Sequence, residues 1–223
     1  MKKTMIWLLL FAFCNFGYSQ DVKVKSNAIL DLASTIHKIV IIHPEHGEIS
    51  AGTAFCTKVA QEGSQWRVTL TTCKHVAKSL EFKYGPAGGN MYTKVLIHRF
   101  YPTPQSFIMD RFEAGQIPIG GKDIYRLSYL TKIRPDMMAL KKAKKMPKEG
   151  EWLVTYGCPK GMWPVMRLHT YLAQNKEGIN LMPYSDPGTS GSPIVNMQGR
   201  YVGILNKSNP NFTAGLLQLE GMK

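Results

Sequence analysis

The stretch DPGTSGSPIV, Asp186 to Val195, joins an irregular turn directly to the start of an apolar strand. It holds two prolines, two glycines, a threonine and two serines before it turns apolar at Ile194. Gly188 lets the backbone approach closely and adopt a conformation that other residues resist, and Ser190 follows it in the same turn. Backbone N–H groups beside a serine hydroxyl are what acyl transfer needs, because the hydroxyl attacks and the amides hold the negative oxygen that develops. Ser190 is therefore a candidate nucleophile.

A serine nucleophile needs a base and an acid that orients the base. The segment TLTTCKHVA, residues 69–77, places His75 near the end of a predicted strand, and IRPDMMALK, residues 133–141, places Asp136 just before another. The order is then His75, Asp136, Ser190, with spacings of 61 (136 − 75) and 54 (190 − 136) residues. No histidine follows Ser190, so the Ser-Asp-His order of the α/β-hydrolases is excluded for this serine. His-Asp-Ser is the order of the chymotrypsin type.

The rest of the chain predicts an all-β protein. Short apolar runs with alternation and β-branched residues are separated by Gly, Pro, Asn and Asp, which is typical of strands joined by turns. Many short strands at fairly even spacing favour a sandwich or barrel. The basic segment 141–151 divides the chain into two β units, 21–145 and 146–223. We predict a helix at 26–35, a turn or two of helix after His75, and strands at 36–43, 50–59, 66–73, 94–100, 137–142, 151–157, 165–173, 191–196, 201–206 and 214–219.

Residues 1–20 have the pattern of a signal peptide. Lys2 and Lys3 are followed by a short apolar run that ends at Phe13, and then by small and polar residues. The apolar run is too short to span a bilayer, which takes about 20 residues. We expect cleavage near Ser19–Gln20 and an exported protein, periplasmic or extracellular, that does not stay in the membrane.

The chain is strongly basic, with a formal net charge of +13. Removal of Lys2 and Lys3 with the signal leaves 26 basic (28 − 2) against 15 acidic residues, or +11. Such a balance favours anionic surfaces or substrates. No basic motif with interleaved aromatic residues accompanies the charge, so we expect no specific nucleic-acid partner.

Three cysteines remain after signal removal: Cys56, Cys73 and Cys158. Cys56 and Cys73 flank a predicted hairpin whose turn centres on Gly63–Ser64, which would set them opposite each other on one face. An exported protein can form a disulfide there, and two buried free thiols are the alternative. The HPEH segment, residues 43–46, is weak evidence for a metal site, and we predict no metal or cofactor.

Five motifs follow one another along the chain: GTAFCTKV (52–59), TLTTCKHV (69–76), DMMALK (136–141), VTYGCPKG (154–161) and PGTSGSPIVNMQGRYVGI (187–204). Together they resemble the trypsin-like serine peptidases of the chymotrypsin fold, in their compact bacterial and viral form. The fourth is similar to the Gly-x-Pro turn of HtrA-like peptidases, and the fifth to the serine motif of flavivirus-type proteases. The resemblance covers residues 36–219 and implies two six-stranded antiparallel β-barrels with the active site between them.

The resemblance also implies a role for each site residue. Ser190 would attack a peptide carbonyl, His75 would take its proton and pass it to the leaving amine, and Asp136 would fix the tautomer of the histidine. The backbone N–H groups of Gly188 and Ser190 would form the oxyanion hole. The expected activity is a serine endopeptidase that acts on protein or peptide substrates.

Two positions depart from the digestive enzymes of this family. Those enzymes carry an aspartate just before the serine, which pairs with a new N-terminus on activation, whereas this chain has Thr189. We therefore expect signal cleavage alone to suffice. The position six before the serine often lies at the base of the primary specificity pocket, and here it is Tyr184, so a preference for Lys or Arg is not implied.

Several alternatives stay open. Asp110 and Asp123 also lie between His75 and Ser190, but neither precedes a Met-Met-Ala-Leu-type strand, so Asp136 is preferred. A pseudoprotease that uses the same fold as a secreted binding module is the second functional hypothesis, and a basic scaffold for anionic polymers is a third. An intact triad favours the enzyme, because a binding module need not keep all three residues.

Overall fold

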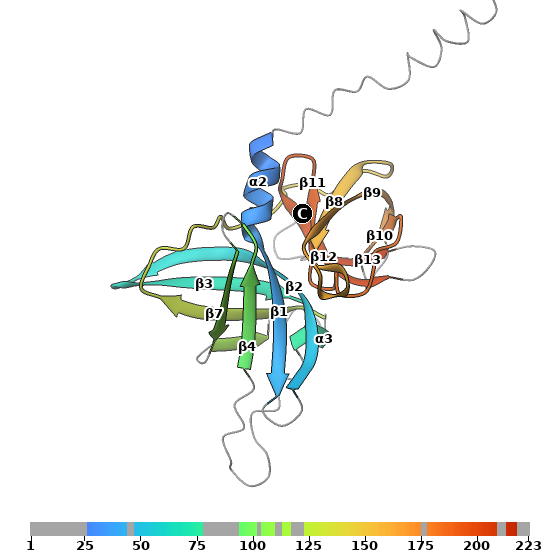
Figure 1. Cartoon of the computed structure of the whole chain (residues 1–223). Coiled ribbons are helices and arrows are strands. Elements are labelled where there is room, and N and C mark those ends of the chain that lie inside the picture. The colour runs from blue at the N-terminus through green and yellow to red at the C-terminus, as the bar shows by residue number, and fades with distance from the viewer. Residues whose placement is uncertain are drawn as a thin grey trace, which may run out of the picture.

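The computed structural model describes the chain in eight segments: 26–43, 47–77, 94–101, 104–109, 113–116, 123–174, 178–208 and 213–217. Its strands form two antiparallel units that lie side by side, and the N-terminal helix α2 (Ser26–Thr35) leads directly into the first (Figure 1). The predicted signal peptide lies outside the described residues. Within the described segments, no helix is long and apolar enough to cross a membrane.

The first unit is a seven-stranded antiparallel sheet in the order β5-β4-β1-β2-β3-β7-β6. Its longest strand, β2, pairs with β1 along one edge and with β3 along the other. The β2–β3 hairpin turns at Gly63, whose φ of 59° suits a glycine. The strands are β1 (Ile36–His43), β2 (Gly47–Glu62), β3 (Gln65–Thr72), β4 (Lys94–Arg99), β5 (Gln105–Met109), β6 (Glu113–Gln116) and β7 (Tyr125–Thr131), and the short helix α3 (Lys74–Ala77) follows β3.

The second unit is a closed six-stranded barrel in the order β10-β13-β12-β11-β8-β9. Alternation of inward and outward residues is clear on β8, where Leu153 and Thr155 are buried and Trp152 is exposed. A 3-10 turn, η2 (Pro159–Gly161), joins β8 to β9. The strands are β8 (Trp152–Gly157), β9 (Val165–Gln174), β10 (Ile179–Met182), β11 (Pro193–Asn196), β12 (Tyr201–Ser208) and β13 (Thr213–Leu217).

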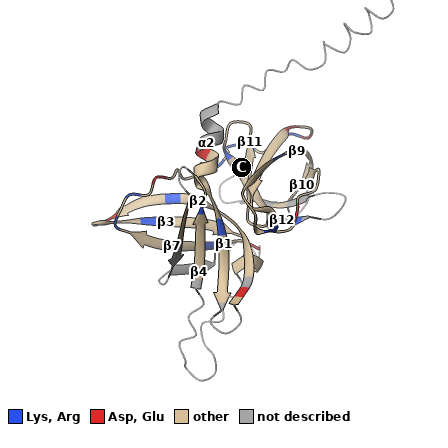
Figure 2. Cartoon of the chain, in the orientation of Figure 1, with Lys and Arg blue, Asp and Glu red and all other residues tan. Residues whose placement is uncertain are grey.

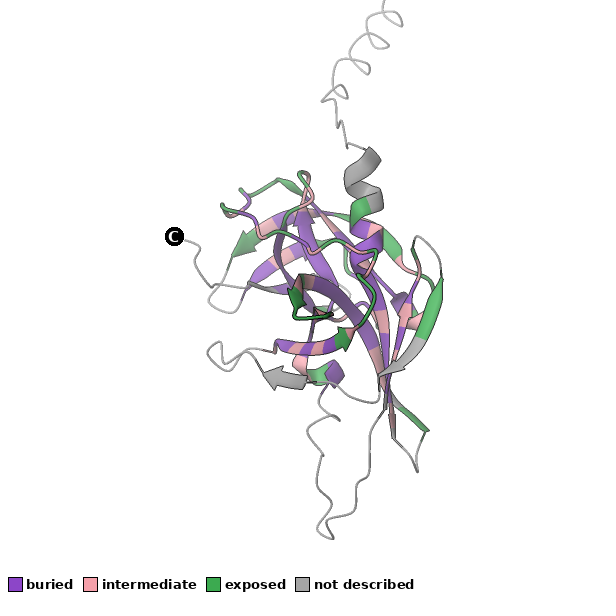
Figure 3. Ribbon diagram, turned by 90° about the vertical axis from the view of Figure 1, so that its left-hand side faces the viewer, coloured by how far each residue is buried: buried purple, intermediate pink, exposed green. Residues whose placement is uncertain are grey.

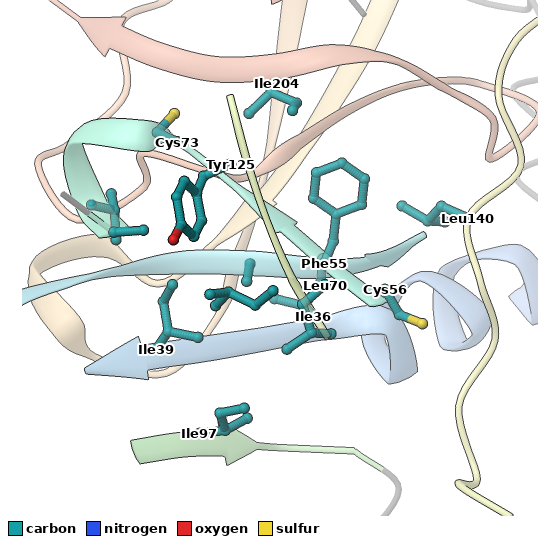
Figure 4. Close-up of a cluster of buried hydrophobic side chains, with 14 of the residues drawn as sticks. Ile36, Ile39, Phe55, Cys56, Leu70, Cys73, Ile97, Tyr125, Leu140 and Ile204 are labelled. Carbon is teal, nitrogen blue, oxygen red and sulfur yellow. The ribbon is translucent and has the colours of Figure 1, made fainter. Parts of the chain in front are cut away.

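The larger hydrophobic cluster belongs to both units. It is centred on the first sheet but includes Tyr201 and Ile204 of β12, and Ile204 is labelled in Figure 4. The ring of Phe55, on β2, meets that of Tyr201 edge-on at a centroid distance of 5.5 Å, a favoured aromatic geometry. Buried positions run along the strands of both units (Figure 3). The two units therefore share apolar burial, which fixes their relative position.

The basic segment between the units is held against the barrel. Tyr201 N–H donates to the carbonyl of Lys141, and Ala143 N–H donates to the carbonyl of Tyr201. The segment therefore crosses between the two units while it is hydrogen-bonded to β12.

Lysines and arginines lie on strands of both units rather than on one element (Figure 2).

The predicted all-β class is confirmed, and the second unit has the six strands expected. The first unit has seven strands where the resemblance implies six, and β5, β6 and β7 form at 105–109, 113–116 and 125–131, where we predicted no strand. The strand predicted at 137–142 is wrong: these residues form only an isolated bridge, between Lys142 and Tyr201. The place beside β3 is taken by β7, which pairs with it from Trp66↔Thr131 to Thr72↔Tyr125.

Candidate active site

The candidate nucleophile turn, Asp186–Ser192, consists of two successive tight turns. Thr189 N–H donates to the carbonyl of Asp186 at 3.3 Å, and Ser192 N–H donates to that of Thr189 at 3.0 Å. The third residue of each turn is a glycine, Gly188 or Gly191, with φ of 89° in both. A positive φ at this position is the requirement of a type II turn, which glycine meets without strain. The irregular sequence therefore specifies two turns that present Ser190 between them.

Backbone donors are left free at this place. Among the described residues, the N–H groups of Gly188 and Ser190 have no hydrogen-bond acceptor. The turns are instead held by hydroxyls: Thr189 Oγ1 donates to Asp186 O at 2.6 Å and Ser192 Oγ donates to Thr189 O at 2.5 Å. The two N–H groups are therefore available to an oxygen of a bound molecule.

The direction of the Gly188 N–H is set by the turn after β8. Lys160 N–H donates to the carbonyl of Pro187 at 2.6 Å. In a trans peptide the C=O and the next N–H point in opposite directions, so this bond turns the Gly188 N–H away from Lys160. A Cβ on Gly188 would lie 2.7 Å from Lys160 N and 2.8 Å from Cys158 O. Glycine is thus required here by packing as well as by φ.

His75 lies at the start of α3 and makes two hydrogen bonds to one carboxylate. Its backbone N–H donates to Asp123 Oδ1 at 2.7 Å, and its Nδ1 lies 2.5 Å from Asp123 Oδ2. With the proton on Nδ1, the Nε2 lone pair is free to accept a proton. The pairing Thr72↔Tyr125 explains the contact, because His75 follows the end of β3 and Asp123 precedes the start of β7.

The prediction that Asp136 orients His75 is wrong in this structure. Asp136 is exposed, and its recorded contact is through its carbonyl, 3.5 Å from Arg99 Nη1. Asp123 holds the position instead. The usable signal was the strand after Asp123, YRLSYLT, in which Tyr125, Leu127 and Tyr129 are buried in alternation. The misleading signal was the apolar run after Asp136, which we predicted to be a strand but which crosses between the units.

Thr53, completely buried on β2, brings the nucleophile turn to the first unit. Its N–H donates to the carbonyl of Ser190 at 2.9 Å, and its Oγ1 donates to that of Gly188 at 3.1 Å. Its Oγ1 also accepts from Cys158 N–H at 2.9 Å. A Cβ on Gly52 would contact both the side chain of Val76 and the carbonyl of Ser190. Ser190 and the α3 turn that carries His75 therefore pack against the same glycine.

The serine and the histidine are near but not bonded. No hydrogen bond joins Ser190 Oγ to His75 in the described part of the chain. Catalytic hydrogen bonds are often long without substrate and tighten in the complex. The arrangement is a histidine–carboxylate pair on one unit facing a serine turn on the other.

Cys56 and Cys73 are not bridged; both are buried free thiols. The disulfide alternative fails because Cys56 faces Leu70 across the hairpin, while Cys73 lies beyond the end of β3. Cys73 Sγ instead donates to the carbonyl of Leu205 at 3.2 Å. Burial, with the nearby charge of Asp123, raises the pKa of Cys73 well above its usual range.

Tyr184, the residue predicted for the specificity pocket, lies at the surface and is 46% exposed. The buried residue of this segment is its neighbour Ser185. Arg167 on β9 clamps the segment: it donates to the carbonyl of Tyr184 at 2.8 Å and to Asp186 Oδ2 at 2.7 Å. That clamp fixes the residues immediately before the nucleophile turn.

Thr53→Val should lower the free energy of unfolding by about 1–3 kcal/mol, because the buried Cys158 N–H and Gly188 carbonyl each lose a partner. Chemical denaturation of the two proteins measures this. Thr53→Ser keeps the hydroxyl and is the matched control, expected to lose less. Equal losses in the two variants would contradict a role for the hydroxyl.

Comparison with solved structures finds the same fold. The chain matches the crystal structure of Deg5 with a TM-score of 0.66 and 13% identity, over 89% of this chain and 91% of Deg5. It matches the HtrA-type protease AlgW, solved with a tripeptide, with a TM-score of 0.62 and 16% identity, over 86% of this chain and 59% of AlgW. For the Rv3671c protease from M. tuberculosis in its active form, the TM-score is 0.60 at 16% identity, over 89% and 82% of the two chains.

No protein-family model matches the chain, and no curated protein matches it by sequence. The structural matches therefore carry the comparison, and at 13–16% identity they establish the fold. This chain has the trypsin-like serine peptidase fold of the HtrA-type proteases.

Proposed function

We propose that the protein is an exported serine endopeptidase whose triad is His75, Asp123 and Ser190. One observation carries the proposal: the double hydrogen bond from His75 to Asp123, placed on the unit that faces the serine turn. The two free N–H groups of Gly188 and Ser190 support it, because acyl transfer needs donors beside the nucleophile.

In the proposed mechanism, Ser190 Oγ attacks the peptide carbonyl while His75 Nε2 removes the hydroxyl proton. The negative oxygen of the tetrahedral intermediate accepts hydrogen bonds from the N–H groups of Gly188 and Ser190. His75 then gives its proton to the leaving amine, which leaves an acyl-enzyme. Water, deprotonated by His75, attacks the ester and releases Ser190. Asp123 holds the proton on Nδ1 throughout and stabilises the charged ring.

The edge of β12 offers a place for an extended substrate. β11 pairs with β12 only as far as Pro193↔Ile204, while β13 continues on the other side to Ser208. The backbone of β12 after Leu205 is therefore unpaired on the side of the nucleophile turn, within the described residues. A peptide added there as a further strand would gain main-chain hydrogen bonds.

Export rests on the N-terminal sequence pattern, residues 1–20. Expression of the full chain in a bacterial host should yield a periplasmic or secreted protein shortened near Ser19–Gln20, as measured by mass spectrometry. Recovery of the intact chain from the cytoplasm alone would contradict export.

A secreted binding module of the same fold is the second candidate. The observation that favours it is the lack of a hydrogen bond between Ser190 Oγ and His75. The two candidates differ in whether Ser190 is activated, which a serine-reactive probe measures directly.

The purified protein should react with a fluorophosphonate probe, because His75 removes the Ser190 proton as the phosphorus is attacked. Ser190→Ala should show no labelling, and His75→Ala should react at least about 10³-fold more slowly. Circular dichroism checks that each variant is folded. If the parent protein is folded but is not labelled, the enzyme hypothesis is overturned and the binding-module hypothesis is favoured.

The choice of acid is tested by Asp123→Asn beside Asp136→Asn. Asp123→Asn should reduce the turnover of a peptide substrate by about 10⁴-fold, because an asparagine holds the wrong histidine tautomer. Asp136→Asn changes an exposed side chain and should stay within about twofold of the parent. The reverse ranking would return the role of the acid to Asp136.

A further inference from the structure

The His75–Asp123 pair has a third chemical neighbour that the proposed mechanism does not use. Cys73, His75 and Asp123 each offer one ligand atom, and these atoms all lie within 4.8 Å of one another. Cys73 follows the last residue of β3 and His75 stands two residues further on, while Asp123 precedes β7. The β3–β7 pairing thus holds all three residues at the same end of these two strands, where β3 ends and β7 begins.

The three donors form a set that suits zinc. Thiolate sulfur, imidazole nitrogen and carboxylate oxygen are the ligands of Zn²⁺, and three protein ligands leave the fourth position for water. The sulfur disfavours hard cations such as Ca²⁺ and Mg²⁺, which prefer oxygen. Cys73 is fully buried, but the side chains of His75 and Asp123 are 47% and 27% exposed. An ion can therefore enter from the histidine side, where water can complete its coordination.

The distances require a modest adjustment. Zinc–ligand bonds of about 2.0–2.3 Å place the ligand atoms of a tetrahedral site about 3.3–3.6 Å apart. The His75 Nδ1 to Asp123 Oδ2 distance of 2.5 Å must then widen by about 1 Å. The His75 ring, at the start of the short helix α3, is half-exposed, so its solvent side leaves room for this movement.

The charges also balance. A dication at this place would stand between the thiolate of Cys73 and the carboxylate of Asp123, which together carry two negative charges.

We propose that Cys73, His75 and Asp123 form an inhibitory site for a thiophilic divalent cation of the zinc type. The inhibitory part rests on the proposed peptidase function. An ion on Nδ1 replaces the hydrogen bond to Asp123 and withdraws electron density from the ring, so Nε2 becomes a poor base. Ser190 is then not activated while the metal is bound, and a chelator reverses the effect.

Cadmium binding tests the site without any need for activity. The full chain with Ser190→Ala is titrated with Cd²⁺, and the ultraviolet thiolate-to-cadmium band is followed. Cys73→Ala in the same background should bind at least about tenfold more weakly. Cys56→Ala is the matched control, because it removes another buried free thiol outside the cluster, and it should bind like the parent. Equal binding by the two cysteine variants, or no band in the parent, overturns the site.

Measuring the effect of zinc on the peptidase rate of the chain with Ser190 intact tests the proposed inhibition. At a free zinc concentration ten times the dissociation constant, the peptidase rate should fall about elevenfold, and the chelator should restore it. Each cysteine variant is compared with its own zinc-free rate, and inhibition should be weaker only for Cys73→Ala. Cadmium binding without any loss of rate would overturn the inhibitory role. A chain without peptidase activity would refute the proposed function, while the cadmium result still decides the site.

Discussion

The hydrogen bonds of one buried threonine hold the candidate site together. The N–H of Thr53 donates to the carbonyl of Ser190, and its hydroxyl donates to the carbonyl of Gly188 and accepts from the N–H of Cys158. Its carbonyl accepts a hydrogen bond of 2.7 Å from Thr72 Oγ1. Buried polar groups must be paired, so the two units cannot separate at this point without leaving several groups unsatisfied. The contacts that join the units are therefore the contacts that place the serine beside the histidine.

Close packing at glycines completes the joint. A Cβ on Gly191 would lie 1.9 Å from the carbonyl of Thr53, and one on Gly157 would lie 1.8 Å from Ser192 Oγ. A side chain at Gly191 would push the turn away from Thr53 on β2, and one at Gly157 would push Ser192 away from β8. The glycines do not make the site flexible; they let two backbones approach closely enough for Thr53 to bridge them.

The predictable parts of the site were those that a short segment specifies alone. The turn around Ser190 follows from its Pro-Gly and Ser-Gly pairs, and the place of His75 follows from the strand that precedes it. The sequence favours Asp123 only in part, because the choice of the candidate acid depends on which strand pairs with β3. The alternation in YRLSYLT favours Asp123, but the apolar run after Asp136 competes with it, and the three-dimensional pairing decides between them. The strands β5 and β6 were missed for a similar reason, since each lies at an edge of the sheet and has one neighbouring strand.

The contrast between a clear fold match and the lack of any family match has a physical basis in the same contacts. Two of these contacts are hydrogen bonds between main-chain groups: the carbonyl of Ser190 accepts from Thr53 N–H, and the carbonyl of Pro187 accepts from Lys160 N–H. Any residue type can supply these main-chain groups, so they constrain geometry and leave identity free. The residue types that this contact does require are few: glycine where backbones touch, and buried hydroxyls such as those of Thr53 and Thr72. A chain can keep such an architecture while sharing 13–16% of its residues with the proteases that it matches, and its chemistry then rests on the few side chains that meet at the joint.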